Sequence, residues 1–193
     1  MKHIGKSYDK VDAKGILSGK PSYTGDFVPK DALIIKVLRS PHAQAKIKSI
    51  DTSKAKLIPG VEAIFTYEDV PNTRFTLAGQ TYPEPSAYDA LILDSVVRYV
   101  GDEVALVVAK DEATALKAMP LIKVEYEVQK PVLDLRTAMD HETVVHPEDD
   151  ILNHIPVGQD YKRNICVSYH KRVGDIEAEL AKCDYVVEGT YFD

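Results

Sequence analysis

The alternation of apolar and polar residues is clearest from Arg98 to Glu127, where it predicts a strand, a helix and a second strand. Val104 to Val108 is the most apolar strand-like run in the chain, and Ile122 to Glu127 alternates with the period of two that a strand requires. Between these strands, Asp111 stands at a helix N-cap, an Ala-rich helix follows, and Pro120 is expected to end it. Such a unit can bury one face of its helix against a sheet.

Three earlier stretches with β-branched and apolar residues predict further strands of the same domain. They are Ala32 to Arg39, Ala45 to Ile50 and Val61 to Thr66. Asp51 or Thr52 can cap a short helix that Pro59 and Gly60 would end. The pattern therefore indicates an α+β domain, with a mixed sheet and two short helices.

Other parts of the chain contain many turn-forming residues. Residues 1–31 are expected to form a loop-rich lead-in with one short strand near Ile16. Residues 70–93 contain several prolines and predict a long surface loop of the kind that often contacts partners. Residues 132–138 are expected to form a last strand and a short helix.

A change in composition marks the last part of the chain. Residues 140–163 are acidic and lack periodicity, which indicates a connector. Beyond it, alternation predicts strands over 164–172 and 184–192, with a short helix over 176–182 between them. These elements are too few to form a core, so they are expected to open a second, incomplete domain. The predicted division is residues 1–139, a connector over 140–163, and the incomplete domain over 164–193.

Composition narrows the class of protein. The chain has 45% hydrophobic and 28% charged residues, no apolar run of membrane-spanning length and no signal peptide after Met1, which favours a cytoplasmic globular protein. A formal charge of -6 argues against general nucleic-acid binding. Lys46, Lys48, Lys54 and Lys56 are interrupted by acidic and apolar residues, so a solvated face is favoured over a phosphate site.

Two cysteines, Cys166 and Cys183, lack the spacing of a metal or redox motif. We expect two small, mostly buried thiols rather than a catalytic cysteine. An iron–sulfur cluster requires about four thiolate ligands, so this chain cannot hold one.

Two glycine-containing stretches resemble nucleotide-binding motifs but do not match them. Gly15 to Pro21 is one residue short of a phosphate-binding loop, and Pro21 replaces the hydroxyl residue that would bind magnesium. Gly101 is a single glycine leading into a strand, whereas a dinucleotide-binding turn has three glycines that open a helix. Gly101 is therefore expected to form a tight bend.

The histidines do not define a site either. The spacing of His141, His146 and His154 does not match a helical metal-binding pair. His42 follows an apolar strand, where a general base is conceivable, but a turn histidine bonded to backbone groups is favoured because no partner can be identified. We predict no catalytic, cofactor-binding or metal-binding residue in this chain.

Five stretches together resemble the N-terminal part of the molybdenum-cofactor subunit in the xanthine dehydrogenase/aldehyde oxidase family. The stretches are Gly5-Lys6-Ser7 with Val11-Asp12-Ala13 and Gly19-Lys20; Tyr23 to Phe27; Leu38 to Ala43; Ile50 to Ala55 with Pro59-Gly60-Val61 and Glu68-Asp69-Val70; and Val97 to Ala105 with Val124 to Glu127. Residues 181–191 also resemble the first strand of that family's molybdopterin-binding domain.

The resemblance implies an α/β hammerhead domain within an oxidoreductase that hydroxylates an aromatic heterocycle, such as a purine, or an aldehyde. Molybdopterin would belong to the full subunit, with iron–sulfur clusters and FAD on partner chains, because the motifs begin close to Met1. The family's cofactor contacts and catalytic glutamate lie in later segments, so no functional residue is carried over. Pro120 departs from related sequences, which continue the helix there.

Two functions of different classes remain open. In the first, the chain is the hammerhead region of a molybdenum hydroxylase, a structural and subunit-contact module that is inactive alone. In the second, it is a free-standing binding or scaffold module without redox chemistry. Reading the gene past Asp193 separates them, since a long continuation favours the first. The substrate stays open among purines, other heterocycles, aldehydes and carbon monoxide.

Overall fold

The computed structural model of the chain describes residues 3–20, 23–79, 82–83 and 85–191. The strands are β1 Ile34–Arg39, β2 Ala45–Asp51, β3 Val61–Phe65, β4 Val96–Val97, β5 Glu103–Ala109 and β6 Lys123–Val128. The α-helices are α1 Ala13–Leu17, α2 Ser53–Lys56, α3 Glu112–Ala118 and α4 Ile176–Leu180. Short 3-10 helices are η1 Thr24–Phe27, η2 Met119–Leu121, η3 Leu135–Thr137 and η4 Tyr161–Arg163. The expected α+β class is confirmed.

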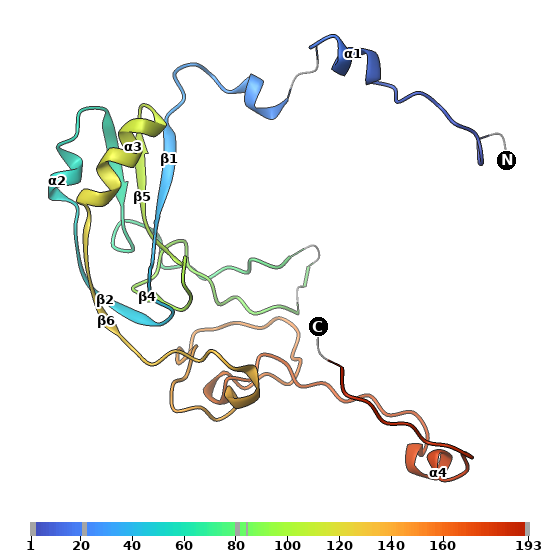
Figure 1. Cartoon of the computed structure of the whole chain (residues 1–193). Helices are drawn as coiled ribbons and strands as arrows, with labels where there is room; N and C mark the ends of the chain where they lie inside the picture. Colours follow the sequence, from blue (N-terminus) through green and yellow to red (C-terminus); the bar gives the residue numbers. More distant parts are fainter. Residues whose placement is uncertain (1–2, 21–22, 80–81, 84, 192–193) are drawn as a thin grey trace.

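The described strands form two antiparallel sheets, with strand orders β1–β5–β3 and β4–β2–β6 (Figure 1). The expectation of one mixed sheet is therefore wrong. The separation begins at Ser40, whose N–H donates to the Asp102 carbonyl at 2.8 Å and whose carbonyl accepts from Gly101 N–H at 2.8 Å. This turn ends β1, so β2 pairs with β4 and β6 instead of joining the first sheet.

The predicted strand–helix–strand unit is confirmed as β5, α3 and β6. Asp111 caps α3, because its Oδ1 accepts the Thr114 N–H at 2.7 Å. Pro120 lies in η2, which follows α3 at once, so the α-helix ends where the proline ring predicts. The two strands lie in different sheets, however, and α3 packs on β1, β5 and β3.

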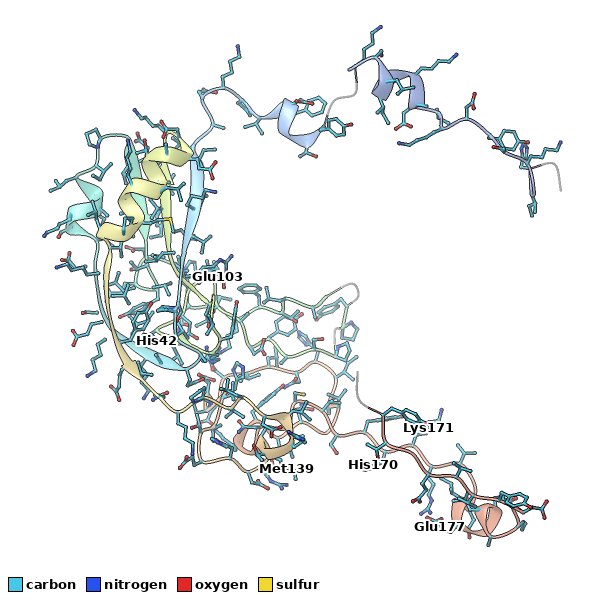
Figure 2. All side chains as sticks on the ribbon, viewed as in Figure 1. His42, Glu103, Met139, His170, Lys171 and Glu177 are labelled. Carbon is cyan, nitrogen blue, oxygen red and sulfur yellow. The ribbon has the colours of Figure 1, made fainter. Side chains whose placement is uncertain are left out.

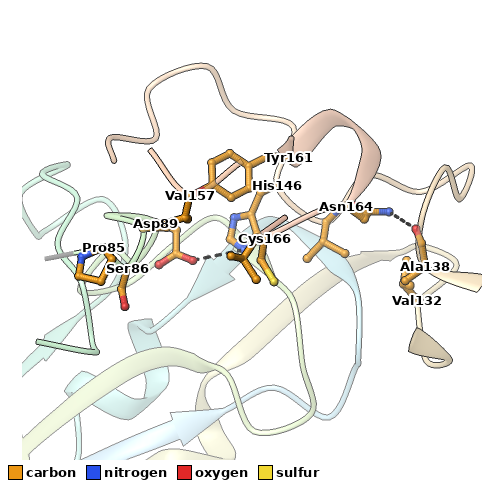
Figure 3. A pocket seen from close by; sticks show the side chains of 13 residues that line it. Pro85, Ser86, Asp89, Val132, Ala138, His146, Val157, Tyr161, Asn164 and Cys166 are labelled. Atoms are coloured by element: carbon orange, nitrogen blue, oxygen red, sulfur yellow. Dashed lines mark hydrogen bonds and ion pairs between the residues drawn. The ribbon is translucent and has the colours of Figure 1, made fainter. Parts of the chain in front are cut away.

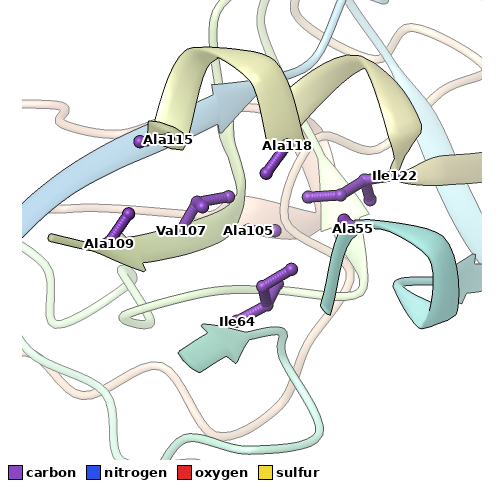
Figure 4. Packing of buried hydrophobic residues seen from close by; sticks show 8 residues of the cluster. All are labelled: Ala55, Ile64, Ala105, Val107, Ala109, Ala115, Ala118 and Ile122. Atoms are coloured by element: carbon purple, nitrogen blue, oxygen red, sulfur yellow. The ribbon is translucent and has the colours of Figure 1, made fainter. Parts of the chain in front are cut away.

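Small side chains bring α3 close to the first sheet (Figure 4). Ala115 and Ala118 of the helix are fully buried, as are Ala105, Val107 and Ala109 of β5. The second core, Ala45, Ile47, Val97 and Val104, lies between the sheets. Leu38, Ile50 and Val124 pack against both cores, so the two sheets share one apolar interior.

The two sheets and their cores form what we call the body. Outside the body, four strand predictions are wrong, and one strand was missed. The Ile16 region is the helix α1, and residues 132–138 contain only η3. Residues 164–172 contribute only an isolated bridge, Asp160 to Ile165, and residues 184–191 form no strand in the part of the chain described, with Phe192 lying outside it. A strand requires a neighbour to pair with over several residues, and within the described structure these stretches have at most the single bridge at Ile165. The missed strand is β4.

The two ends of the chain extend away from the body as arms (Figure 1). We call residues 3–31 the N-terminal arm and residues 168–191 the C-terminal arm. Their apolar side chains are unusually exposed, with Leu17 at 88% and Val187 at 92%. Figure 2 shows His170, Lys171 and Glu177 on the C-terminal arm, far from His42 and Glu103 on the body. No helix among the described residues is both long and apolar enough to cross a membrane.

Candidate functional site

Two cavities share Asp89 and His146 in their linings, the larger between residues 85–89 and 132–167 and the smaller mainly among residues 75–103. The larger, about 590 Å³, has a mainly apolar lining that includes Pro85, Val132, Val157 and Val167 (Figure 3). Residues 71–98 and 132–167 both contribute to this lining, so the cavity exists only because the chain folds back on itself.

The smaller cavity, about 320 Å³, combines apolar side chains with several carboxylates. Its lining includes Phe75 and Leu77 together with Asp94, Asp102 and Glu103. Burial raises the pKa of the Asp102 carboxyl, although the backbone N–H groups of Arg98 and Glu103 oppose this shift. Asp89 and His146 line both cavities and thus belong to the wall between them.

Arg98 is the centre of the contacts that hold this region together. Its side chain is only 12% exposed, and it donates to Asp94 Oδ2 at 2.7 Å and to Glu148 Oε1 at 2.5 Å. It also donates to the Val145 carbonyl at 3.2 Å. Burial disfavours the charged guanidinium, but the two carboxylates outweigh this and raise the pKa of Arg98. Arg98 thus joins the end of β4 to residues 145–148.

His146 lies beside Arg98, between two carboxylates from different segments. Its Nε2 is 3.9 Å from Asp89 Oδ2, and its Nδ1 is 3.5 Å from Glu148 Oε2. Both Nδ1 and that Oε2 are buried and have no hydrogen-bond partner among the described residues. Burial is the main cause that lowers the pKa of His146, and the positive charge of Arg98 adds to it, while Asp89 and Glu148 oppose the shift.

Further contacts tie residues 71–94 to the predicted connector, residues 140–163. Arg74 Nε pairs with Asp150 Oδ1 at 2.8 Å, and the Tyr88 N–H donates to the Leu152 carbonyl at 2.9 Å. The predicted long loop over 70–93 contains isolated bridges but no strand among its described residues. No local sequence pattern indicates these pairings, because the partners lie far apart in the chain.

The three connector histidines have separate environments. His141 Nδ1 accepts the Thr143 N–H at 3.0 Å. His154 packs edge-on against the rings of Tyr82 and Tyr88, with centroids 5.3 and 4.8 Å away. Within the described ranges, no group of three or more His, Cys, Asp or Glu side chains is placed to hold a metal ion.

His42 and Gly101 take the places that the sequence favoured. The Ser40 hydroxyl bonds to the backbone N–H and carbonyl of His42, each at 3.0 Å, while the His42 ring packs edge-on against Tyr126. The His42 ring has no ion pair or hydrogen bond with a carboxylate among the described side chains. Gly101 has φ +102° in the turn where the Asp102 N–H donates to the Tyr99 carbonyl. The tight bend at Gly101 is confirmed, whereas the bonds printed for His42 are made by its backbone and its ring packs against Tyr126.

The prediction of buried cysteines is wrong, since Cys166 and Cys183 are both exposed. Cys183 lies on the C-terminal arm, which no other part of the described chain covers, and Cys166 lines the larger cavity. The stretch from Gly15 to Pro21, rejected above as a phosphate-binding loop, begins in a helix, because Gly15 lies within α1. Pro21 lies outside the described residues.

Neither cavity fits a phosphate-bearing pterin cofactor. Among the residues that the structure describes, the lining of the larger cavity includes no lysine or arginine, and it includes the acidic Asp89. The smaller cavity contains Arg98, but Asp94 and Glu148 already engage that guanidinium. An anionic group would meet more carboxylates than free cations in either cavity. The exposed thiols are also too few to ligate an iron–sulfur cluster.

The part of the chain that holds both sheets matches a known family. The sequence profile described as aldehyde oxidase and xanthine dehydrogenase, a/b hammerhead domain, matches residues 18–130, more than half of the chain. The chain belongs to this family.

Individual relatives agree with the assignment. The chain is 40% identical to the probable hypoxanthine oxidase XdhD of Escherichia coli, over 97% of this chain and 22% of that protein. It is 32% identical to the xanthine dehydrogenase molybdenum-binding subunit of Escherichia coli, over 94% of this chain and 23% of the relative. The chain therefore spans less than a quarter of the length of these curated relatives.

Solved structures share the fold. The aldehyde oxidoreductase from Desulfovibrio gigas aligns with a TM-score of 0.63 and 30% identity, over 74% of this chain and 16% of that structure. The reconstituted CO dehydrogenase from Oligotropha carboxidovorans aligns with a TM-score of 0.60 and 33% identity, over 72% and 17%. At these identities the likeness supports both the fold and the family.

Proposed function

We propose that this chain is the hammerhead portion of a molybdenum-dependent hydroxylase subunit and serves as a structural and subunit-contact module. The observation that carries the proposal is the pair of arms, which display apolar side chains such as Leu17 and Val187 at 88% and 92% exposure. Apolar surface on this scale gains free energy when a partner covers it. The body between the arms has its own core and provides a rigid support.

In this proposal, residues 1–139 form the hammerhead unit, 140–163 connect it, and 164–193 belong with a molybdopterin-binding domain. The cofactor chemistry lies outside the 193 residues, with molybdopterin in the remainder of the subunit and iron–sulfur clusters and FAD on partner chains. The substrate is a small heterocycle or aldehyde, and the assembly works in the cytoplasm without nucleic acid or membrane. The names of the relatives support this assignment, since they include molybdenum-binding and large molybdopterin subunits.

A reconstitution experiment tests the proposal. The chain is purified alone and together with a separately expressed remainder of the subunit, and molybdenum and pterin are measured in each sample. We expect neither in the chain alone, and both in a complex that contains the two parts. Stoichiometric molybdenum or pterin in the chain alone would overturn the assignment of the chemistry to other segments.

A deletion separates contact through the arms from contact through the body. Removing residues 3–31 leaves both sheets intact, because this arm contributes no strand to them. We expect the shortened chain to fold, with a far-ultraviolet circular dichroism spectrum that shows the body's secondary structure unchanged. It should bind the remainder of the subunit at least tenfold more weakly. Unchanged binding by this variant and by one that lacks residues 168–191 would place the contact on the body and contradict the role of the arms, whereas no binding by the intact chain would favour the free-standing scaffold module.

A further inference from the structure

The wall between the two cavities holds two polar groups that face each other without forming a hydrogen bond. His146 Nε2 and Asp89 Oδ2 lie 3.9 Å apart, which is beyond the length of a hydrogen bond (Figure 3). Both residues line the larger, mainly apolar cavity of about 590 Å³. No hydrogen-bond donor reaches the Asp89 carboxylate among the residues that the structure describes. The space between these two atoms can therefore take a third group.

The position of the hydrogen on His146 decides which kind of group fits this space. A neutral imidazole has one N–H and one acceptor nitrogen. Nδ1 faces Glu148 Oε2 at 3.5 Å, and that buried oxygen has no other donor among the described residues, so the hydrogen belongs on Nδ1. Burial lowers the pKa of His146, although Asp89 and Glu148 oppose the shift, and the ring is neutral at pH 7.5. Nε2 is then an acceptor that faces a second acceptor, and we call the space between Nε2 and Asp89 Oδ2 the acceptor gap.

The surrounding charges favour a cation in the acceptor gap. Arg98 is already engaged by two carboxylates, and Arg74 pairs with Asp150 at 2.8 Å. Arg74 also donates to the backbone carbonyl of Asp89 at 2.8 Å, which holds that residue in place. The Asp89 carboxylate itself has no lysine or arginine partner among the described side chains. The wall thus presents a fixed negative charge beside the neutral acceptor of His146.

Two other polar side chains in the lining of the larger cavity are already satisfied within the chain. Asn164 Oδ1 accepts the Val145 N–H at 2.8 Å, and its Nδ2 donates to two backbone carbonyls at 3.0 and 2.9 Å. The Tyr161 hydroxyl donates to Asn153 Oδ1 at 2.7 Å. A ligand in this cavity would therefore bury an apolar body against the lining and direct its polar group to the acceptor gap.

We propose that the larger cavity binds a small primary amine with an apolar body, whose ammonium group bridges Asp89 Oδ2 and His146 Nε2. A nitrogen about 2.8 Å from each acceptor would see them at an angle of about 90°, which two N–H bonds of a tetrahedral ammonium group match with nearly straight hydrogen bonds. The third N–H can reach water, because the Asp89 side chain is 39% exposed. Apolar side chains such as Val132 and Val157 would cover the body of the ligand. A cavity of about 590 Å³ is of ordinary size for a small-molecule site.

A nuclear magnetic resonance titration of the intact chain at pH 7.5 tests the amine site, with benzylamine as the probe and nitrogen-15 label in the histidines. We expect saturable binding with a Kd on the order of 1 mM or tighter. The His146 Nε2 resonance should shift, while that of His42, which packs against Tyr126 on the body, should not. Benzyltrimethylammonium has the charge but no N–H, and benzyl alcohol has a donor but no charge, so each should bind at least about tenfold more weakly. Equal binding of benzylamine and benzyltrimethylammonium, or no saturable shift at His146, would overturn the proposal.

Two variants make the test specific to Asp89. Asp89→Asn keeps the shape of the side chain but removes its charge, and should weaken benzylamine binding at least about tenfold. Asp149→Asn removes a carboxylate that is 91% exposed and pairs with Lys162 outside the lining of the larger cavity, and should change the affinity by less than about twofold. Equal losses in the two variants would mean that benzylamine responds only to net charge, which would refute the site. If Asp89→Asn does not fold, as judged by circular dichroism, the comparison of benzylamine with benzyltrimethylammonium on the unmodified chain decides. The site is formed by this chain alone, so these results do not depend on the subunit-contact role proposed above.

Discussion

At the scale of single residues, the backbone conformation of Gly101 explains how two strands leave one turn in the required directions. Its φ of +102° is strained for residues with a Cβ atom. Its N–H donates to the Ser40 carbonyl in the turn after β1, and its carbonyl accepts from the side chain of Arg39 at the end of β1. The sequence predicts a bend at this position because a single glycine precedes an apolar strand. Its long-range role in joining the start of β5 to the end of β1 was not visible there.

Replacing Gly101 by alanine should therefore destabilise the chain through its backbone alone. A Cβ atom at this position would meet no heavy atom within 4 Å, so steric contact plays no part. We expect a loss of about 1–3 kcal/mol in the free energy of unfolding, measured with urea. Gly15→Ala is the matched control, since Gly15 also has open space but lies in α1 with ordinary helical dihedral angles. Equal effects of the two substitutions would contradict the explanation.

At the scale of elements, α3 lies close to its sheet because the contact is built from small side chains. Ala115 and Ala118 face a surface that includes Val107, which is fully buried at 0% exposure. Because the backbones of α3 and the sheet lie close together, few neighbouring side chains can move to fill a void left by a truncated residue. The same surface would reject a larger side chain on either element.

Val107→Ala should consequently leave a cavity that the surrounding alanines cannot fill. We expect a loss of about 2 kcal/mol in the free energy of unfolding, measured by urea denaturation. Val128→Ala at the end of β6, where the side chain is 61% exposed, should change it by less than about 0.5 kcal/mol. A small effect at Val107 would mean that α3 is not held by this core.

A second element-scale contact is the Arg98 cluster, where a single guanidinium satisfies two carboxylates. Arg98→Met keeps apolar bulk but leaves Asp94 and Glu148 without their cation. We expect a loss of about 3 kcal/mol in stability, together with faster proteolysis between residues 140 and 163. Lys130→Met is the control, because its pair with Glu142 is exposed on both sides and should contribute less than about 1 kcal/mol. Similar losses in both variants would contradict a buried role for Arg98.

At the scale of the whole molecule, the chain consists of one body and two arms of very different stability. The body holds both sheets and both cores, while the arms contribute no strand to either sheet (Figure 1). Segments without buried contacts open with little free-energy cost. The arms should therefore behave as independent segments until a partner covers them.

Limited trypsin digestion followed by mass spectrometry checks this difference. We expect cleavage at Lys14 and Lys171 on the arms to be at least about tenfold faster than at Lys123 of β6. Lys123 is itself exposed, but its backbone is paired with Asp51 of β2, which makes it a suitable internal control. Adding the remainder of the subunit should protect both arm sites. Comparable rates at all three lysines in the isolated chain would contradict the division into body and arms.

Local physics explains what could be predicted and what could not. The Asp111 cap, the Pro120 stop and the Gly101 bend depend on residues within a few positions of each other, so their sequence patterns were sufficient. The exposure of the cysteines and the Arg98–Glu148 pair, whose members are 50 positions apart, depend on which distant segments meet. No local pattern specifies that choice, because the cost of closing a long loop is repaid only by contacts formed after closure.

The sequence by itself determined the class of the fold, the strand–helix–strand unit and, through its motifs, the family. Only the tertiary structure decided that the strands divide into two antiparallel sheets and that His146 stands between two carboxylates in a shared cavity wall. It also decided that residues 164–172 and 184–191 are not strands within the described chain. Alternation encodes the ability to form a strand, whereas hydrogen bonding to a neighbour makes one, and the neighbour is a property of the assembled chain.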